Sequence, residues 1–188
     1  SGAVDLEFRH DAVMALAELL ARMDKHWKSW LAAGEDLVFT CGVVNTAPTA
    51  AIAIIPGEVT FGLDMRSLSM DTLWKFHKLM EAECEAIAKE RGVKFEFDDV
   101  LVCEASGVAP EVRGRLETAA KEHNLHALSL PSGAGHDAAV LSNAGVPVGM
   151  IFVANQNGSH NWREAMKIDD FMAGTELLWH TVCDFDKA

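Results

Sequence analysis

The sequence predicts an α+β unit, with an antiparallel sheet and two helices on one face, followed by a partial α/β unit with parallel strands. Two observations indicate this. Residues 11–103 alternate between long amphipathic helices and strands in which every second side chain is apolar. After Ser106-Gly107 the pattern changes, and residues 146–154 (VPVGMIFVA) are nearly all apolar, as in a strand buried on both faces of a parallel sheet. We therefore expect two domains, residues 1–107 and 108–188.

The first domain should contain two long helices. Residues 11–31 carry apolar side chains three or four positions apart, and Gly34 ends this pattern. Residues 69–91 repeat such a face, and Gly92 stands where a left-handed helix cap belongs. The expected inward side chains are Val13, Leu16, Leu20, Met23, Trp27 and Leu31 in the first helix, and Leu73, His77, Met80, Cys84 and Ile87 in the second.

Three alternating segments of the first domain are typical of half-buried strands. We expect the core face to hold Leu37, Phe39, Cys41 and Val43 in the first, and Val59, Phe61, Leu63 and Met65 in the second. A third strand should start at Val93 and end near Cys103. One face of this sheet then remains uncovered, which favours a partner subunit.

The second domain reads as helix, strand, helix, strand, helix. The expected helices are 110–123, the short HDAAVLSNAG segment ending at Gly145, and 168–183 with Phe171, Leu178 and Val182 inward. The expected strands are 125–130 and 146–154. Because two parallel strands do not make a complete sheet, we expect further strands upstream of this sequence.

Composition excludes several classes of function. The chain has 188 residues and a net charge of -12 without a basic stripe, which argues against nucleic-acid binding. No apolar run is long enough to span a membrane and nothing resembles a signal peptide, so we expect a cytoplasmic protein without membrane association. Four scattered cysteines without a CxxC pair argue against a disulfide scaffold or a zinc ribbon.

Two histidines follow the two expected parallel strands. His136 lies in the glycine-rich loop after the first strand, and His160 lies in the loop after the second. Ligands of open α/β sheets bind beyond the carboxyl ends of the strands, so the two side chains should meet at one edge as a zinc site or an acid–base site. Alternatively, each is an ordinary exposed loop histidine, and Gly-Ala-Gly merely turns a strand into a helix.

Arg66 shares the outer face of its strand with Asp64. It is either a surface ion pair or a guanidinium fork for a substrate carboxylate, and the residues alone favour the surface pair. His77 lies on a helix face, which favours packing or capping over metal binding. The remaining histidines have no partner of metal-site type at helical or loop spacing: His10, His26, His123, His126 and His180.

Four motifs together resemble one enzyme family. They are IPGEVTFGLDMRS (55–67), SGAGHDA (132–138), PVGMIFV (147–153) and GSHNWRE (158–164), and the opening SGAVDLEFRHDAV fits the same pattern. The sequence is similar to the zinc-dependent carbamoyl-amidohydrolases, which include N-carbamoyl-L-amino acid hydrolase, β-alanine synthase and allantoate amidohydrolase. The resemblance implies that residues 1–107 form a lid and dimerisation domain and that residues 108–188 are the C-terminal segment of a catalytic domain.

The resemblance also implies a reaction and its residues. A water activated by zinc, or by manganese, attacks a ureido carbonyl, with two metal ions per full-length site and most of their ligands upstream of this sequence. The partners would be a small substrate with a carboxylate and a second copy of the chain. The implied roles are metal ligand for His160, oxyanion donor for His136, carboxylate clamp for Arg66, pocket lining for Ser132, Gly133 and Gly135, and support of the His160 loop for Glu164.

The sequence departs from the family pattern near the expected substrate site. Ala53 and Thr49 replace asparagines, Ala154-Asn155 replaces Pro-Ser, and Trp162 stands where proline is common. These changes leave the substrate open. A dipeptidase or aminoacylase of the same superfamily and a non-catalytic dimerisation or binding module remain as alternatives, and we expect the isolated chain to hydrolyse nothing.

Overall fold

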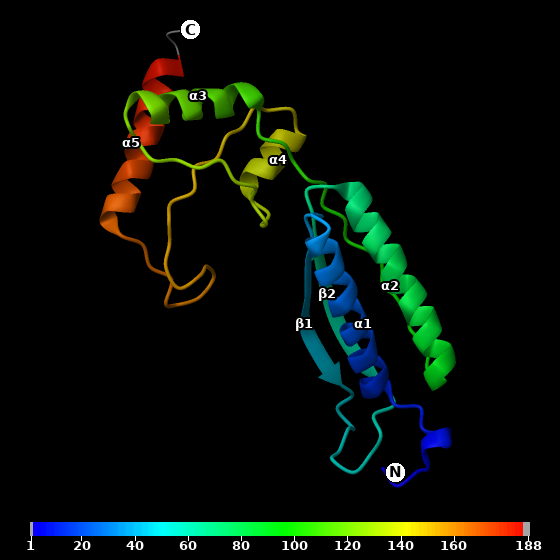
Figure 1. Cartoon of the computed structure of the whole chain (residues 1–188). Coiled ribbons are helices and arrows are strands. Elements are labelled where there is room, and N and C mark those ends of the chain that lie inside the picture. Colours follow the sequence, from blue (N-terminus) through cyan, green and yellow to red (C-terminus); the bar gives the residue numbers. More distant parts are fainter. Residues whose placement is uncertain (1, 186–188) are drawn as a thin grey trace. The chain divides into compact units, whose positions relative to one another are not determined.

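The computed structural model describes residues 2–185 and divides the chain into two compact units, Ser1–Ala105 and Ser106–Ala188 (Figure 1). Each unit has a buried core of its own. No helix among the described residues is both long enough and apolar enough to cross a membrane. In chain order the first unit holds η1 (Leu6–Phe8), α1 (Ala12–Ala32), β1 (Val38–Thr46), β2 (Val59–Arg66) and α2 (Met70–Arg91).

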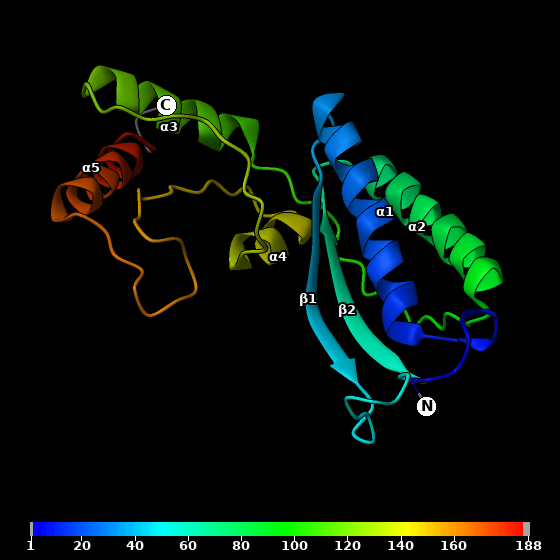
Figure 2. The same ribbon diagram turned by 60° about the horizontal axis from the view of Figure 1, so that its bottom comes forward.

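The first unit confirms an antiparallel sheet with two helices on one face. β1 pairs antiparallel with β2, and Figure 2 shows α1 and α2 on the same side of this pair. Phe76 of α2 is fully buried there, with its ring 5.7 Å from that of Phe39 in β1 and 5.1 Å from that of Trp30 in α1. The aromatic contacts join both helices to the sheet.

Local chemistry fixes the ends of both helices where the sequence predicts them. Asp11 Oδ1 accepts the Met14 N–H at 3.1 Å to cap α1, and Ser69 Oγ accepts the Thr72 N–H at 3.2 Å to cap α2. Gly92 ends α2 with φ +62°, a left-handed conformation that favours glycine.

Three side chains expected inside the first unit are exposed. Val43 is 54% exposed because a β-bulge between Cys41 and Val43 shifts the register and breaks the alternation. Val13 and Leu31 lie at the rim of the α1 face and are 37% and 43% exposed, since the buried line of α1 passes through Leu19 instead.

The third expected strand, residues 93–103, does not form. Val93 and Phe95 pack against the core of the unit, but no ladder pairs their backbone with β1 or β2. Alternation of apolar and polar residues indicates which side chains face a core. A strand also requires hydrogen bonds to a neighbouring backbone, and none of the described residues provides them here.

In the second unit the helices predicted from the sequence form, and the parallel strands do not. The helices are α3 (Pro110–Glu122), α4 (Asp137–Asn143) and α5 (Ile168–Phe185). Residues 125–130 and 146–154 lie outside any ladder among the described residues. The second segment packs its side chains on helices: a Cβ on Gly149 would lie 2.5 Å from Val112 of α3, and one on Gly174 of α5 would lie 3.0 Å from Val153.

The expected inward face of α5 is also wrong. Phe171, Leu178 and Val182 are 45%, 53% and 60% exposed, whereas Leu177 and Thr181 are buried. Leu177 faces α3, where it forms the core of the unit with Ala119 and Ala120. Helical spacing marks an apolar face on α5, but α3 covers a different side of that helix.

Candidate functional site

A hydroxyl and an aromatic ring hold His136. The loop before α4 places Ser132 Oγ 2.7 Å from His136 Nε2. Ser132 Oγ also donates to the Ala134 carbonyl at 3.0 Å, which uses its only proton, so His136 Nε2–H is the donor to Oγ. The imidazole, half-buried, also lies edge-on to Phe152, with ring centroids 5.7 Å apart.

The two glycines beside His136 face open space. A Cβ on Gly133 or Gly135 would meet no atom of the described residues within 4 Å. Neither glycine has positive φ, so the turn itself does not require them. The absence of side chains at these glycines therefore leaves space beside His136, and the backbone angles of the turn do not require glycine.

Residues 155–165 form the loop that carries His160. Gln156 and Ala165 close its ends with two backbone hydrogen bonds of 2.6 and 3.2 Å. Inside the loop, Glu164 Oε2 accepts the backbone N–H of His160 at 3.1 Å, while Oε1 accepts Asn155 Nδ2 at 2.9 Å. His160 has a φ of +59°, a conformation that a non-glycine residue adopts only when its surroundings impose it.

The His160 ring fits the role of a metal ligand. The side chain is exposed, and within residues 2–185 no group hydrogen-bonds to its ring nitrogens. A neutral imidazole with an available nitrogen is a common zinc ligand. His160 belongs to no group of three possible ligands among the described residues, so it could supply one ligand and the others would have to come from elsewhere.

Arg66 lies on the outer face of β2 and is paired there. Its Nε donates to Asp64 Oδ2 at 2.7 Å, and both side chains are about half exposed, at 48% and 50%. The surface pair that the residues favour is therefore present. Binding of a substrate carboxylate by Arg66 stays a prediction, as does the meeting of His136 and His160.

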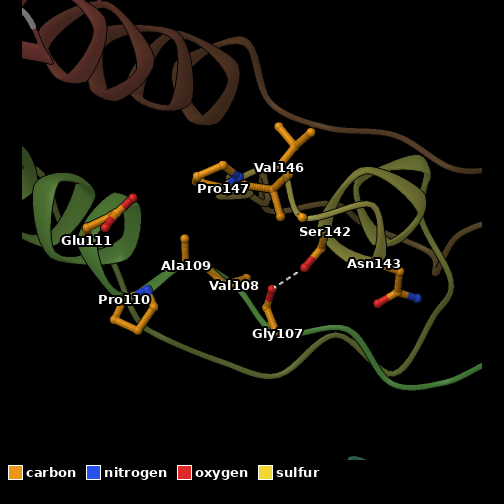
Figure 3. A pocket seen from close by; sticks show the side chains of 11 residues that line it. Gly107, Val108, Ala109, Pro110, Glu111, Ser142, Asn143, Val146 and Pro147 are labelled. Atoms are coloured by element: carbon orange, nitrogen blue, oxygen red, sulfur yellow. Dashed lines mark hydrogen bonds between the residues drawn. The ribbon is translucent and has the colours of Figure 1, made fainter.

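A hollow of the second unit lies apart from the predicted site residues. It has a volume of about 440 Å³ and lies between the start of α3 and the end of α4, where Ser142 Oγ donates to the Gly107 carbonyl at 2.7 Å (Figure 3). Apart from Glu111, its lining residues carry no titratable side chain. Catalysis by this hollow has no support.

Sequence reasoning misses the side-chain roles of Ser132 and Asn155. The resemblance assigns Ser132 only a place in the pocket lining, yet its hydroxyl holds His136, and the four-residue spacing between them is the available signal. Asn155 stands out from the sequence only as a departure from the family pattern, yet its amide binds the carboxylate that holds the His160 loop.

A match to a protein-family model identifies the family of this chain. The model described as peptidase family M20/M25/M40 matches residues 15–184. The chain belongs to this family. The resemblance to the carbamoyl-amidohydrolases is confirmed by relatives such as an N-carbamoyl-L-amino acid amidohydrolase from Geobacillus stearothermophilus, 31% identical over 97% of this chain and 43% of its own length.

Other members of the peptidase M20/M25/M40 family give the same picture. The allantoate amidohydrolase of Escherichia coli K12 is 29% identical over 95% of this chain and 42% of its own length. The crystal structure of AtUAH in complex with glyoxylate matches with a TM-score of 0.85 and 29% identity over 100% of this chain and 44% of that one. This chain therefore spans less than half the length of the relatives it matches.

Proposed function

We propose that this chain is part of a metal-dependent amidohydrolase that cleaves the ureido C–N bond of an N-carbamoyl amino acid or of allantoate. The names of the relatives support this reaction class, since they include N-carbamoyl-L-amino acid amidohydrolase and allantoate amidohydrolase. The observation that carries the proposal is the His160 loop, in which Glu164 fixes the backbone and leaves the imidazole available. The enzyme is then a hydrolase acting on linear amides.

In this proposal His160 holds one of two metal ions, zinc or manganese. The bound metal supplies Lewis acidity that activates water for attack on the ureido carbon. The imidazole nitrogens of His160 match the preference of zinc for nitrogen ligands. Glu164 would keep the loop in this conformation, because its carboxylate accepts the backbone N–H of His160 and leaves the ring nitrogens available.

His136 stabilises the oxyanion that develops on the ureido carbonyl. Its Nε2–H already donates to Ser132 Oγ at 2.7 Å. The same N–H could donate to the carbonyl oxygen of the substrate. The substrate oxygen would replace the hydroxyl as acceptor, in the open space beside Gly133 and Gly135. Arg66 would exchange Asp64 for the substrate carboxylate, with bidentate geometry.

In this proposal the two units have different roles, one as the lid and the other as a segment of the catalytic domain. Residues 1–107 would form the lid and pair with a second copy through the sheet, whose outer face includes the exposed Val43 opposite Gly62. Residues 108–188 would belong to the catalytic domain, in which strands outside this chain pair with residues 125–130 and 146–154. All four cysteines are free, which fits the reducing cytoplasm.

Hydrolysis by the full-length protein that carries the segment tests this function, measured as ammonia release from the ureido substrates and as release of a free amino acid from the dipeptide and the N-acyl amino acid. The panel contains N-carbamoyl amino acids, allantoate, a dipeptide and an N-acyl amino acid, each with zinc or manganese added. We expect turnover of a ureido substrate, loss of at least about 100-fold in kcat for His136→Ala, and little change for the exposed His126→Ala. Hydrolysis of the dipeptide or the N-acyl substrate alone would move the chain to the dipeptidase or aminoacylase branch.

A non-catalytic dimerisation or binding module is the second candidate. It is favoured because His160 belongs to no group of three possible metal ligands within residues 2–185. The isolated 188-residue chain should form a dimer by light scattering and hydrolyse nothing in either case. A metal-loaded full-length protein without turnover on any substrate of the panel would support the module over the enzyme.

A further inference from the structure

We propose that Glu122, His123 and Asp184 form a second metal site, which binds a divalent zinc-type ion where α3 and α5 end. One ligand atom from each of the three side chains lies within 4.8 Å of the others. None of these residues belongs to the predicted catalytic set. The proposal therefore stands whether or not the chain takes part in hydrolysis.

The three side chains come from two helices. Glu122 is the last residue of α3 and His123 is its C-cap, whereas Asp184 lies in the last turn of α5. Ligand atoms of a tetrahedral zinc ion lie roughly 3.4 Å apart, given metal–ligand distances near 2.1 Å. Small side-chain rotations would bring the three atoms from their present separation to that distance, because Glu122 is exposed and free to move.

A second imidazole fixes the plane of His123. The His180 ring stacks on it with centroids 3.3 Å apart and an angle of 11° between the planes. His180 precedes Asp184 by four residues, so both point from the same side of α5. The His-x-x-x-Asp spacing of residues 180–184 is the sequence signal for these contacts. The expectation that His123 has no partner of metal-site type is wrong, because Glu122 and Asp184 place possible ligand atoms beside it.

The surroundings favour a cation and leave room for one. Both α3 and α5 end at the cluster, and the carbonyl end of a helix carries partial negative charge. A hollow of about 420 Å³, lined among others by Glu122, Thr181 and Asp184, provides space for the waters that would complete the coordination. Arg115 also lines the hollow beside the cluster, where its Nη1 donates to the Phe185 carbonyl at 3.1 Å, so the ion would share the negative end of α5 with this guanidinium.

The ligand chemistry selects the ion. Carboxylates alone would suit calcium or magnesium, but an imidazole shifts the preference to zinc and its transition-metal neighbours. Such an ion would join α3 to α5 in a unit whose buried core comprises only Ala119, Ala120 and Leu177. Its role would be structural.

Zinc titration of the 188-residue chain by isothermal calorimetry, in a reducing buffer, tests the proposal. We expect a site whose affinity falls on the order of tenfold or more in His123→Ala and in Glu122→Gln. Glu122→Gln is the safer variant, because an exposed, nearly isosteric change should not disturb folding, which circular dichroism checks. His160→Ala and His126→Ala are the matched controls and should leave this binding unchanged.

Thermal unfolding gives an independent readout. Zinc should raise the Tm of the wild-type chain and of His160→Ala, because a ligand that binds only the folded state stabilises it, and at the same zinc concentration it should raise the Tm of Glu122→Gln less. The proposal is overturned if the chain binds no zinc, if His160→Ala removes the binding, or if Cys183→Ser removes it and Glu122→Gln does not.

Discussion

Glu164 holds two parts of the His160 loop with one carboxylate, and this can be tested without a substrate. Each of its two hydrogen bonds contributes about 1 kcal/mol, so Glu164→Ala should populate the open loop roughly 30-fold more. Trypsin should then cut after Arg163 faster by a similar factor, as followed by mass spectrometry. Glu176→Ala, a surface change on α5, is the control, and equal cleavage in both variants would contradict the role of Glu164.

The cysteines differ in reactivity because they differ in burial. Burial, followed by the nearby charges of Glu81 and Glu83, raises the pKa of the Cys84 thiol to about 11. The reactive thiolate therefore forms only as the pH approaches that value, whereas Cys103 and Cys183 are exposed. We expect iodoacetamide near pH 8 to label Cys103 and Cys183 in the native chain and to reach Cys84 only in denaturant. Prompt labelling of native Cys84 would contradict this.

At the scale of residues, the sequence singles out candidate positions for chemistry but does not indicate which contacts hold them. His136 and His160 stand out because a polar side chain among small residues is conspicuous. The contacts of Ser132 and Asn155 depend on how each loop closes on itself, through backbone angles such as the φ of +59° at His160. No composition or spacing encodes those angles directly.

At the scale of elements, Phe76 joins α2 to both α1 and β1. Its ring is fully buried between Trp30 and Phe39, so Phe76→Ala should leave a cavity and lower the free energy of unfolding of the first unit by about 3–5 kcal/mol. Urea denaturation measures the change. Phe97→Ala is the matched control, because Phe97 is 53% exposed and its truncation should cost less than about 1 kcal/mol.

Charged side chains between α1 and α2 make the first unit sensitive to acid. Hydrogen bonds from His26 and Arg22 hold the pKa of Glu83 below its ordinary value of 4.5. The folded state then binds fewer protons than the unfolded state, so this stabilisation is present above pH 4.5 and is lost as the pH falls through the lowered pKa.

Glu83→Gln should therefore flatten the dependence of the unfolding free energy on pH below about 4.5. Glu85→Gln, an exposed neighbour on the same helix, should leave the slope unchanged. Urea denaturation at a series of pH values measures both, and identical slopes for wild type and Glu83→Gln would contradict the assignment.

The helices were predictable and three of the five expected strands were not, for a physical reason. Asp11, Ser69 and Gly92 fix helix ends through bonds to residues at most a few positions away. A strand depends on a distant backbone, and residues 93–103, 125–130 and 146–154 have the apolar pattern of strands without a paired neighbour among the described residues. Alternation predicted the buried side of β2 correctly because β1 is there to pair with it.

At the scale of the whole molecule, the two units differ in how much core they bury. The main cluster of the first unit contains nine buried residues, drawn from α1, α2 and the start of the sheet. The cluster of the second contains three, of which two are alanines. The sequence did not predict this difference in core size. The apolar face of residues 168–183 indicates that α5 should be covered, but it does not reveal that α3 packs on a different side of the helix.

This imbalance predicts that the second unit opens first. Local stability follows the apolar area buried, so amides of α3 and α5 should exchange with solvent at least about 30-fold faster than those of α1 and α2, a difference of roughly 2 kcal/mol. Hydrogen-exchange mass spectrometry of the 188-residue chain with a chelator present measures both sets in one experiment. Phe76→Ala should then accelerate exchange in α1 and α2 and reduce the difference in exchange rate between the two units, because it removes a core side chain from the first unit alone. Equal protection of α2 and α5 in the wild-type chain would show that three buried residues suffice to stabilise the second unit, and that the exposed side chains of α5 need no further cover.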